Sequence, residues 1–161
     1  MDRVNAILRH PSYIMTIDRV AELEKDRIFC GHSMDHLLDV ARIAYILWLE
    51  SGGQTGSGAD KEIIYAAALL HDAGRAKQYE DRTPHELESA RIAGEILPEC
   101  GFSQTETKMI IDAILSHRTE SPGRPGISGI LYQADKLSRR CDCCLASEQC
   151  DWATKNTGLV Y

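Results

Sequence analysis

Two adjacent residues near the middle of the chain, His71 and Asp72, carry the clearest chemical signal of the sequence. They directly follow an apolar run, residues 63–70, whose composition is that of a core helix. A carboxylate at the end of such a helix is costly to bury unless it is paired or coordinates a cation. Asp72 therefore needs a compensating group nearby, and a metal ion that is also bound by imidazoles is a candidate.

Further histidines and one further acid stand at helical positions that could face this pair. These are His36, His85, His117 and Asp135. His36 and His117 each share a helix face with aliphatic residues, and Asp135 lies in another apolar stretch, so their side chains are expected to point inward. Ligands from different helices of a bundle can converge on metal ions. The set therefore predicts a buried metal site.

Each of these residues also has an ordinary structural explanation. A single histidine on an apolar face is commonly hydrogen-bonded to a backbone carbonyl. His85 could be a surface residue of a first helical turn, and Asp135 could pair with Lys136 or Arg139. The metal site is favoured because unpaired buried carboxylates would be strongly unfavourable, and a divalent cation offsets them.

The hydrophobic spacing predicts helices almost everywhere and no strand, so we expect an all-α helical bundle. Helices are expected over residues 2–8, 12–29, from 33 onward, from a cap at 60 to the His-Asp pair, 109–117 and 127–140. Two capping boxes are predicted, one from Thr83 to Glu86 with Pro84 in the first helical position, and one from Ser103 to Glu106. Residues 52–58 and 121–126 are expected to be loops.

Length and composition narrow the class of protein. A chain of 161 residues with a net charge of −6 is expected to form one domain, and its charge argues against nonspecific nucleic-acid binding. No segment reaches the roughly 20 apolar residues of a membrane span, and the N-terminus lacks a signal-peptide pattern. We therefore expect a cytoplasmic protein whose six cysteines are reduced thiols or metal ligands.

The ordered set of histidines and acids resembles the HD-domain superfamily of metal-dependent phosphohydrolases. The matching segments are DHLLDVARIA with His36, AALLHDAGR with His71 and Asp72, HELESARIAGEIL with His85, AILSHR with His117, and LYQADKLSRR with Asp135. The resemblance covers roughly residues 30–140. It implies a compact helical fold of the HD type.

The resemblance also implies a ligand set for two metal ions. One ion would be bound by His36, His71, Asp72 and Asp135. Asp72 would bridge to a second ion, for which His85 and His117 are the additional ligands. His32 precedes His36 by four residues but does not align with the family pattern, so we expect it near the rim of the site.

Mixed nitrogen and oxygen ligands suit Fe, Mn, Co, Ni or Zn better than Mg or Ca. The implied activity is hydrolysis of a nucleotide or another small phosphate ester, in which Asp72 orients an activated water. Candidate residues for binding the anionic substrate are Arg75, Lys77 and Arg118, with Arg124 as part of a mobile flap. Glu80 and Asp81, expected in a loop before His85, are candidate proton donors.

Four cysteines, Cys141, Cys143, Cys144 and Cys150, cluster after the last predicted helix. They could hold a structural Zn²⁺, form an oxidation-sensitive thiol pair, or be free packed thiols. We expect residues 1–140 to form the metal-binding domain. Residues 141–161, with Trp152 as an anchor, are expected to be a tail packed on or near that domain.

Two other functions are compatible with the same residues. A minority of HD-type proteins are di-iron oxygenases, and a non-catalytic metal-binding regulatory module is the third reading. Retention of all six implied ligands argues against the non-catalytic module. The first two helices could pack on another subunit, so a homo-oligomer is also an alternative to a monomer.

Overall fold

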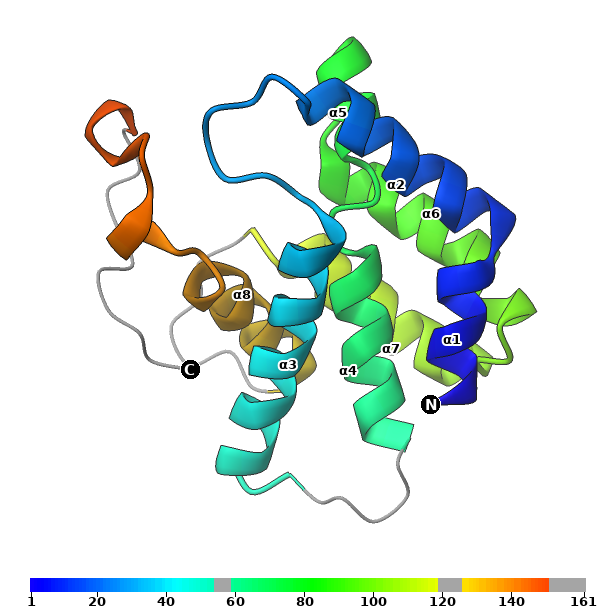
Figure 1. Cartoon of the computed structure of the whole chain (residues 1–161). Coiled ribbons are helices and arrows are strands. Elements are labelled where there is room, and N and C mark those ends of the chain that lie inside the picture. The colour runs from blue at the N-terminus through cyan, green and yellow to red at the C-terminus, as the bar shows by residue number, and fades with distance from the viewer. Residues whose placement is uncertain (54–58, 119–125, 151–161) are drawn as a thin grey trace.

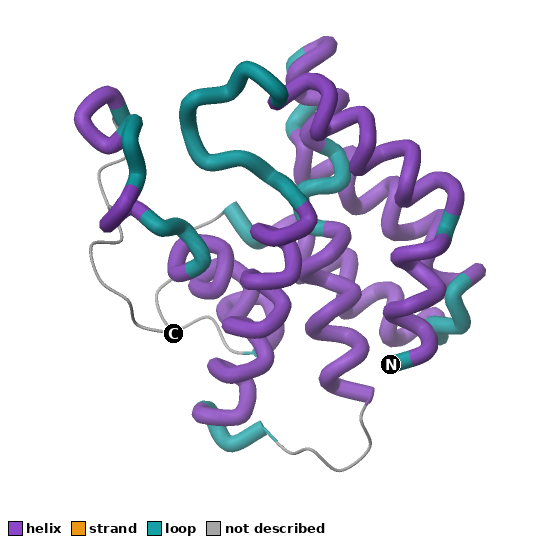
Figure 2. The backbone as a smooth tube through the Cα atoms, in the orientation of Figure 1, coloured by secondary structure: helices purple, strands orange, loops and turns teal. Residues whose placement is uncertain are grey.

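The computed structural model describes residues 1–53, 59–118 and 126–150. Within these ranges the chain forms eight α-helices and two short 3₁₀ helices, and no strand (Figure 1 and Figure 2). The α-helices are α1 (Asp2–Arg9), α2 (Pro11–Glu24), α3 (Met34–Glu50), α4 (Ala59–Leu70), α5 (Arg75–Asp81), α6 (His85–Glu99), α7 (Gln104–Ser116) and α8 (Ile127–Leu137). The 3₁₀ helices are η1 (Cys141–Cys143) and η2 (Ser147–Gln149). The predicted all-α fold is confirmed.

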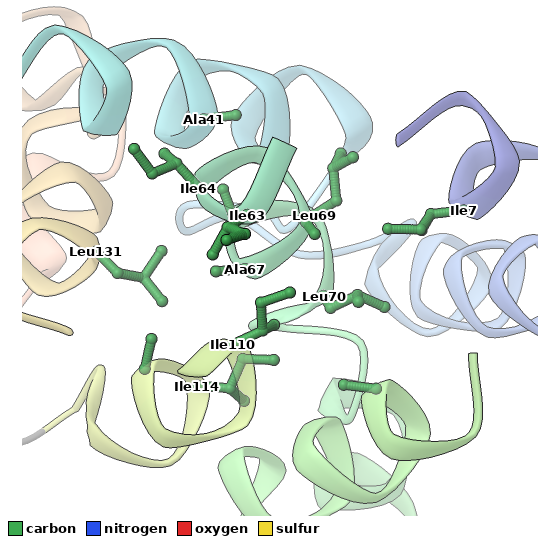
Figure 3. Packing of buried hydrophobic residues seen from close by; sticks show 14 of the residues in the cluster. Ile7, Ala41, Ile63, Ile64, Ala67, Leu69, Leu70, Ile110, Ile114 and Leu131 are labelled. Atoms are coloured by element: carbon green, nitrogen blue, oxygen red, sulfur yellow. The ribbon is translucent and has the colours of Figure 1, made fainter. Parts of the chain in front are cut away.

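Helix α4 lies at the centre of the bundle. It packs against α3 and α7 and also contacts α1, α6 and α8. Figure 3 shows its aliphatic side chains surrounded by those of neighbouring helices, with Leu131 of α8 and Ile110 of α7 facing it from two sides. Residues 66–70 are fully buried, as expected for a helix that is apolar all round. The His71-Asp72 pair therefore begins inside the protein rather than at its surface.

The arrangement of the helices around α4 brings the candidate ligands to one end of the bundle. Helices α3 and α4 lie side by side and run in opposite directions, so the start of α3 is close to the end of α4 (Figure 1). Helix α8 packs against α3 and α7, and α6 packs against α7. Five separate elements therefore contribute to the region around Asp72.

Arg3 connects α1, α4 and α7 at the end of α4 that lies away from His71 and Asp72. Its Nε donates to Glu62 Oε2 of α4 at 2.6 Å, and its Nη1 donates to Glu106 Oε1 of α7 at 2.8 Å. Its guanidinium also lies 4.4 Å from the centre of the Phe102 ring. The predicted capping box at Ser103 is confirmed, because Ser103 Oγ accepts from the backbone N–H of Glu106 and Glu106 Oε2 accepts from that of Ser103.

Three predicted helix boundaries are wrong. Helix α2 ends at Glu24 rather than near residue 29, because the Glu24 carboxylate accepts from the backbone of His32 and fixes the intervening residues as a loop. Asp60 is not a cap but lies in the first turn of α4. Helix α8 ends at Leu137, three residues before the predicted end.

The predicted capping box at Thr83 is also wrong. Thr83 donates its N–H and its hydroxyl to Asp81 Oδ1, at 3.0 and 2.6 Å, so its side chain is turned away from α6. Pro84 is the N-cap residue, and its carbonyl accepts from the N–H groups of Leu87 and Glu88. Arg82, the residue before Thr83, adopts a left-handed conformation with φ of 69° that ends α5.

None of the described helices combines the length with the apolar composition that crossing a membrane requires.

We predict that Glu106→Gln lowers the free energy of unfolding by about 1 kcal/mol near neutral pH. The Arg3 guanidinium and the Ser103 backbone N–H lower the pKa of Glu106 to about 2, from 4.5 in an unconstrained chain. Because the pKa is lower in the folded state, this stabilisation is present above about pH 4.5 and is lost as the pH falls toward 2. Urea unfolding at several pH values measures the difference.

The matched control is Glu22→Gln, since Glu22 pairs with Lys25 on an exposed helix face. This control should change the unfolding free energy by less than about 0.5 kcal/mol at any pH. An equal effect of the two substitutions would show that Arg3 and the capping box contribute no specific stability.

Candidate metal centre

Four side chains from three helical segments form the first group of candidate ligands. They are His36 from α3, His71 and Asp72 from the end of α4, and Asp135 from α8, and each offers a ligand atom within 4.8 Å of all the others. His71 Nε2 lies 3.1 Å from Asp72 Oδ2 and 3.8 Å from Asp135 Oδ1. His36 Nε2 lies 3.7 and 3.5 Å from the same two oxygens. All four ligand atoms therefore face a common point.

The second group shares Asp72 with the first. Asp72, His85 and His117 also offer ligand atoms within 4.8 Å of one another. Here the nearest oxygen is Oδ1, which lies 3.2 Å from His85 Nε2 and 3.9 Å from His117 Nε2. The two imidazole Nε2 atoms are 3.1 Å apart. The two oxygens of one buried carboxylate thus face two different histidine groups.

The other ring nitrogen of each histidine is held by a hydrogen bond. His71 Nδ1 donates to the Ala68 carbonyl at 2.7 Å, and His117 Nδ1 donates to the Ile114 carbonyl at 2.6 Å. These are the backbone bonds of an ordinary core histidine, but they leave Nε2 directed at the acids. Such bonds are typical around metal-binding histidines, whose tautomer and orientation they fix.

The remaining two histidines are held by side chains. His36 Nδ1 lies 3.1 Å from Ser138 Oγ, which itself donates to the Asp135 carbonyl, so the hydroxyl accepts from His36. His85 Nδ1 lies 2.8 Å from Gln78 Oε1. The sequence pattern did not identify Ser138 or Gln78 as site residues. Their role becomes visible only from the contact that each makes with a histidine in the folded structure.

Gly74 allows the two groups to approach. A Cβ atom at this position would lie 2.3 Å from the His85 carbonyl oxygen and 2.7 Å from the Ser89 nitrogen, so any larger residue would push the turn away from α6. The Gly74 N–H donates to the buried Ser89 hydroxyl at 2.8 Å. A glycine two positions after Asp72 was the available sequence signal for this close contact.

The atoms that face the centre fit a metal ion. His36 Nε2, His71 Nε2 and Asp72 Oδ2 are buried and make no hydrogen bond with any described residue. A buried polar atom without a partner is unfavourable by about 1–3 kcal/mol, and three of them meet at one point. Imidazole nitrogens and carboxylate oxygens are the donor set of transition-metal sites. These atoms face one another as ion pairs at 3.1 and 3.7 Å, and a divalent cation would give all three one shared partner.

Burial and the neighbouring charges shift the pKa values of the candidate ligands. Burial lowers the pKa of His36 to about 4 and that of His117 to about 3. Burial also disfavours the charged form of His71, but Asp72 and Asp135 outweigh it and raise the pKa of His71 to about 10. Burial would raise the pKa values of the two acids, yet His71 holds both well below their usual range. Both acids are therefore ionised and available as ligands.

Three cations contact the two carboxylates from outside. Arg75 Nε donates to Asp72 Oδ1 at 2.8 Å. Lys136 Nζ and Arg139 Nη2 donate to the two oxygens of Asp135 at 2.6 and 2.9 Å. Asp135 therefore pairs with Lys136 and Arg139, as its ordinary structural explanation expected, and also belongs to the first ligand group.

The expected position of His32 is wrong. Its side chain is only 4% exposed, and its Nε2 lies 3.6 Å from Asp72 Oδ2. Glu24 accepts hydrogen bonds from the backbone N–H and Nδ1 of His32 and from the Tyr79 hydroxyl. Burial raises the pKa of Glu24, but these bonds lower it to about 2, so the carboxylate stays ionised and compensates for burying His32. His32 is not part of either ligand group.

The candidate substrate-binding cations are distributed unevenly. Arg75 lies beside Asp72, whereas Lys77, two residues further along α5, pairs with Asp81 at 2.8 Å and lines a separate surface groove. Two helical positions correspond to a rotation of about 200°, which directs the two side chains to opposite faces. Arg118 is half-exposed and pairs with Glu86 at 3.2 Å. Arg124 lies outside the described residues.

Glu80 and Asp81 lie in α5 rather than in a loop, which corrects the expectation. Glu80 pairs with Arg19 at 2.7 Å, and Asp81 pairs with Lys77 on the surface. Neither belongs to the two ligand groups. The structure thus gives no support to either acid as a proton donor at the centre.

The described cysteines do not gather as a zinc site would require. Cys141, Cys143, Cys144 and Cys150 are free thiols, and none of them belongs to a group of three or more candidate ligands in the described part of the chain. Trp152, the expected anchor of the tail, lies outside the described residues.

Comparisons with known proteins agree with the geometry. A family model described as HD domain matches residues 34–140. An uncharacterized protein of Clostridium beijerinckii is 42% identical over 163 aligned residues that cover 100% of both chains. A crystal structure of a predicted HD superfamily hydrolase from an uncultured Thermotogales bacterium is 26% identical, with a TM-score of 0.58, over 85% of this chain and 74% of that one.

A more distant similarity is to a larger enzyme. Ribonuclease Y of Enterococcus faecalis is 30% identical over 136 residues, which cover 84% of this chain but only 23% of that enzyme. The chain therefore spans less than a quarter of the length of the ribonuclease.

We predict that Gln78→Leu and Ser138→Ala each weaken a different metal-binding event. Gln78 orients His85 of the second group, and Ser138 orients His36 of the first. Loss of such an orienting bond typically weakens metal affinity 10–100-fold. Calorimetric titration of the metal-free protein with Mn²⁺ should show one weakened and one retained event in each variant.

Gln104→Leu, at an exposed position of α7, is the matched control and should leave both events unchanged. If Gln78→Leu and Ser138→Ala instead weakened the same single event equally, the two histidine groups would not be separate sites.

Proposed function

Because the chain belongs to the HD domain family, we propose that it is a metal-dependent hydrolase acting on a nucleotide or another small phosphate ester. The observation that carries this proposal is the position of Asp72. Its two carboxylate oxygens face two separate histidine groups inside the protein. A carboxylate shared in this way is suited to bridging two metal ions.

The proposed ligands follow the two groups. His36, His71, Asp72 and Asp135 would bind one divalent transition metal, and Asp72, His85 and His117 would bind the other. Two ions bound there would lower the pKa of bound water and neutralise phosphoryl oxygens, which is the chemistry of two-metal hydrolases. The hydrogen bonds of the second ring nitrogens hold the imidazoles in position for this task.

The protein's own residues would supply orientation and charge. Asp72 would orient the attacking water, since its oxygens face both groups. Arg75 lies against Asp72 and also lines a cavity beside the centre, where its guanidinium could donate to a phosphate. Arg118, two residues after the end of α7, is a weaker candidate because it already pairs with Glu86.

A small substrate is favoured over a polynucleotide. The net charge of −6 does not provide the basic surface on which polynucleotide binding depends. The similarity to ribonuclease Y covers only 23% of that enzyme, so it is not sufficient to assign RNA cleavage to this chain.

We predict that His71→Ala and Asp72→Ala each lower metal-dependent hydrolysis by at least about a hundredfold. Both residues face the common point of the first group, and Asp72 also serves the second. The assay is release of nitrophenol from p-nitrophenyl phosphate and bis(p-nitrophenyl) phosphate with Mn²⁺, Co²⁺, Fe²⁺ or Zn²⁺ added.

His10→Ala is the matched control, because His10 pairs with Glu99 and lies outside both ligand groups. It should keep its activity within about twofold. Full turnover in His71→Ala would refute the proposal. Iron binding with oxygen consumption and no hydrolysis would instead indicate the di-iron oxygenase.

A further inference from the structure

One buried histidine beside the centre takes no part in the two ligand groups. His32 lies in the loop that joins α2 to α3, two residues before α3 begins (Figure 1). Its ring lies edge-on to the ring of His36, with 5.8 Å between the ring centres. A polar ring that a loop buries needs partners for its nitrogens. The contacts of the two ring nitrogens of His32 therefore indicate what it does.

The first ring nitrogen of His32 is held by Glu24. The Glu24 carboxylate accepts hydrogen bonds from the backbone N–H and Nδ1 of His32 and from the hydroxyl of Tyr79. Arg27 Nε lies 3.9 Å from the same carboxylate, so the loop itself also compensates this acid. Because an ionised carboxylate can only accept, the proton of a neutral His32 ring is on Nδ1. Its Nε2 then carries the lone pair.

The loop that carries His32 is also fixed from the opposite side. Arg139 Nη1 donates to the carbonyl of Gly31 at 3.1 Å, and Nη2 of the same side chain donates to Asp135 Oδ1 at 2.9 Å. One side chain therefore connects the residue before His32 to a ligand of the first group. Contacts with both α2 and the end of α8 thus set the direction of the His32 ring.

The second ring nitrogen of His32 faces the centre. Its Nε2 lies 3.6 Å from Asp72 Oδ2, which is too long for a hydrogen bond. This distance falls between the 3.1 Å of His71 Nε2 and the 3.7 Å of His36 Nε2 from the same oxygen. His32 is nevertheless outside the group whose ligand atoms all lie within 4.8 Å of one another. Its Nε2 is therefore beside the position of a metal ion and is not one of the atoms that surround it.

The space next to His32 can hold a small molecule. His32 lines a cavity of about 310 Å³ that also reaches Asp135 and Arg75. A water molecule commonly bridges two polar groups that are more than 3.5 Å apart. A divalent ion in the first group would repel a positively charged ring, which favours the neutral form of His32 with its lone pair on Nε2. The partner of Nε2 must then be a hydrogen-bond donor, as a water molecule is.

We propose that His32 is a positioning residue for the hydrolytic reaction. Its Nε2 accepts a hydrogen bond from a water molecule at the first ligand group, while Glu24 and Tyr79 fix the ring for that bond. This inference rests on the metal-dependent function proposed above. An acceptor for one hydrogen of the attacking water sets the direction of the oxygen lone pairs, and such orientation lowers the barrier of the reaction.

The first test uses His32→Asn to separate the two ring nitrogens. An asparagine amide can still donate to Glu24 from the place of Nδ1, but it has no atom at the place of Nε2. In the full chain loaded with Mn²⁺, kcat for bis(p-nitrophenyl) phosphate should fall at least about tenfold, while KM stays within about twofold. Calorimetric titration should show both Mn²⁺-binding events within about threefold of the unchanged protein, since Nε2 is not a ligand.

The second test needs no turnover. The relaxation of solvent water protons by bound Mn²⁺ reports how fast water exchanges at the centre. This exchange should be about three- to tenfold faster in His32→Asn, which is the effect of one lost hydrogen bond.

His10→Asn is the matched control for both measurements. His10 also pairs with a glutamate, Glu99, and asparagine can replace it as the N-cap of α2. The control should leave kcat, Mn²⁺ binding and water exchange unchanged.

Tyr79→Phe is a milder variant that keeps the His32 ring and removes only one hydrogen bond to Glu24. It should lower kcat about two- to fivefold and retain both Mn²⁺-binding events. Tyr45→Phe is its control, because Tyr45 packs against Tyr65, outside the ligand groups and the cavity. Equal kcat in these two variants would overturn the role of Tyr79.

The outcomes distinguish this inference from the proposed function. Loss of a Mn²⁺-binding event in His32→Asn would overturn the inference, because His32 would then be a ligand. Unchanged kcat or unchanged water exchange in His32→Asn would also overturn it. If the unchanged protein binds Mn²⁺ but hydrolyses no phosphate ester, the proposed function fails. Faster water exchange in His32→Asn would then still support the hydrogen bond to Nε2, and unchanged exchange would refute it.

Discussion

The burial of Asp72 is the constraint on which the rest of the structure depends. Its side chain is 1% exposed at the end of a helix whose last five residues are fully buried. An ionised carboxylate in that position requires several compensating groups. The chain provides them from every side: His71 from its own segment, Arg75 from α5, His85 from α6 and His36 from α3. Helix packing and site chemistry are therefore parts of one arrangement, since α4 positions the acid and its neighbours supply the partners.

The same constraint explains why smaller features are found where they are. Gly74 permits the turn after Asp72 to contact α6, which brings His85 into range. Ser138 and Gln78 hold the outer nitrogens of two histidines, so that Nε2 of each is directed inward. His32 and Glu24 form a further buried pair beside Asp72. Each of these residues acts by orienting a group near the centre, and each would be difficult to replace without moving it.

The sequence predicted the all-α fold and the residues that meet at Asp72, because helical spacing places His36, His117 and Asp135 on apolar faces. It did not predict the residues that act through space. Glu24 ends α2 early by accepting from His32, a contact between residues that no periodicity relates. Threonine is a residue type that often caps helices, but the Thr83 hydroxyl donates to Asp81 instead of capping α6. Lys77 is close to Arg75 in sequence yet faces a different groove, because helical rotation separates them.

The central claim is that Asp72 bridges two metal ions, and anomalous diffraction from crystals of the protein grown with Mn²⁺ would test it most directly. The account predicts two anomalous peaks, one on each side of the Asp72 carboxylate. One should lie among His36, His71 and Asp135, and the other between His85 and His117. A single peak that leaves His85 and His117 paired with each other would contradict the binuclear centre, and no peak at Asp72 would contradict the metal site altogether.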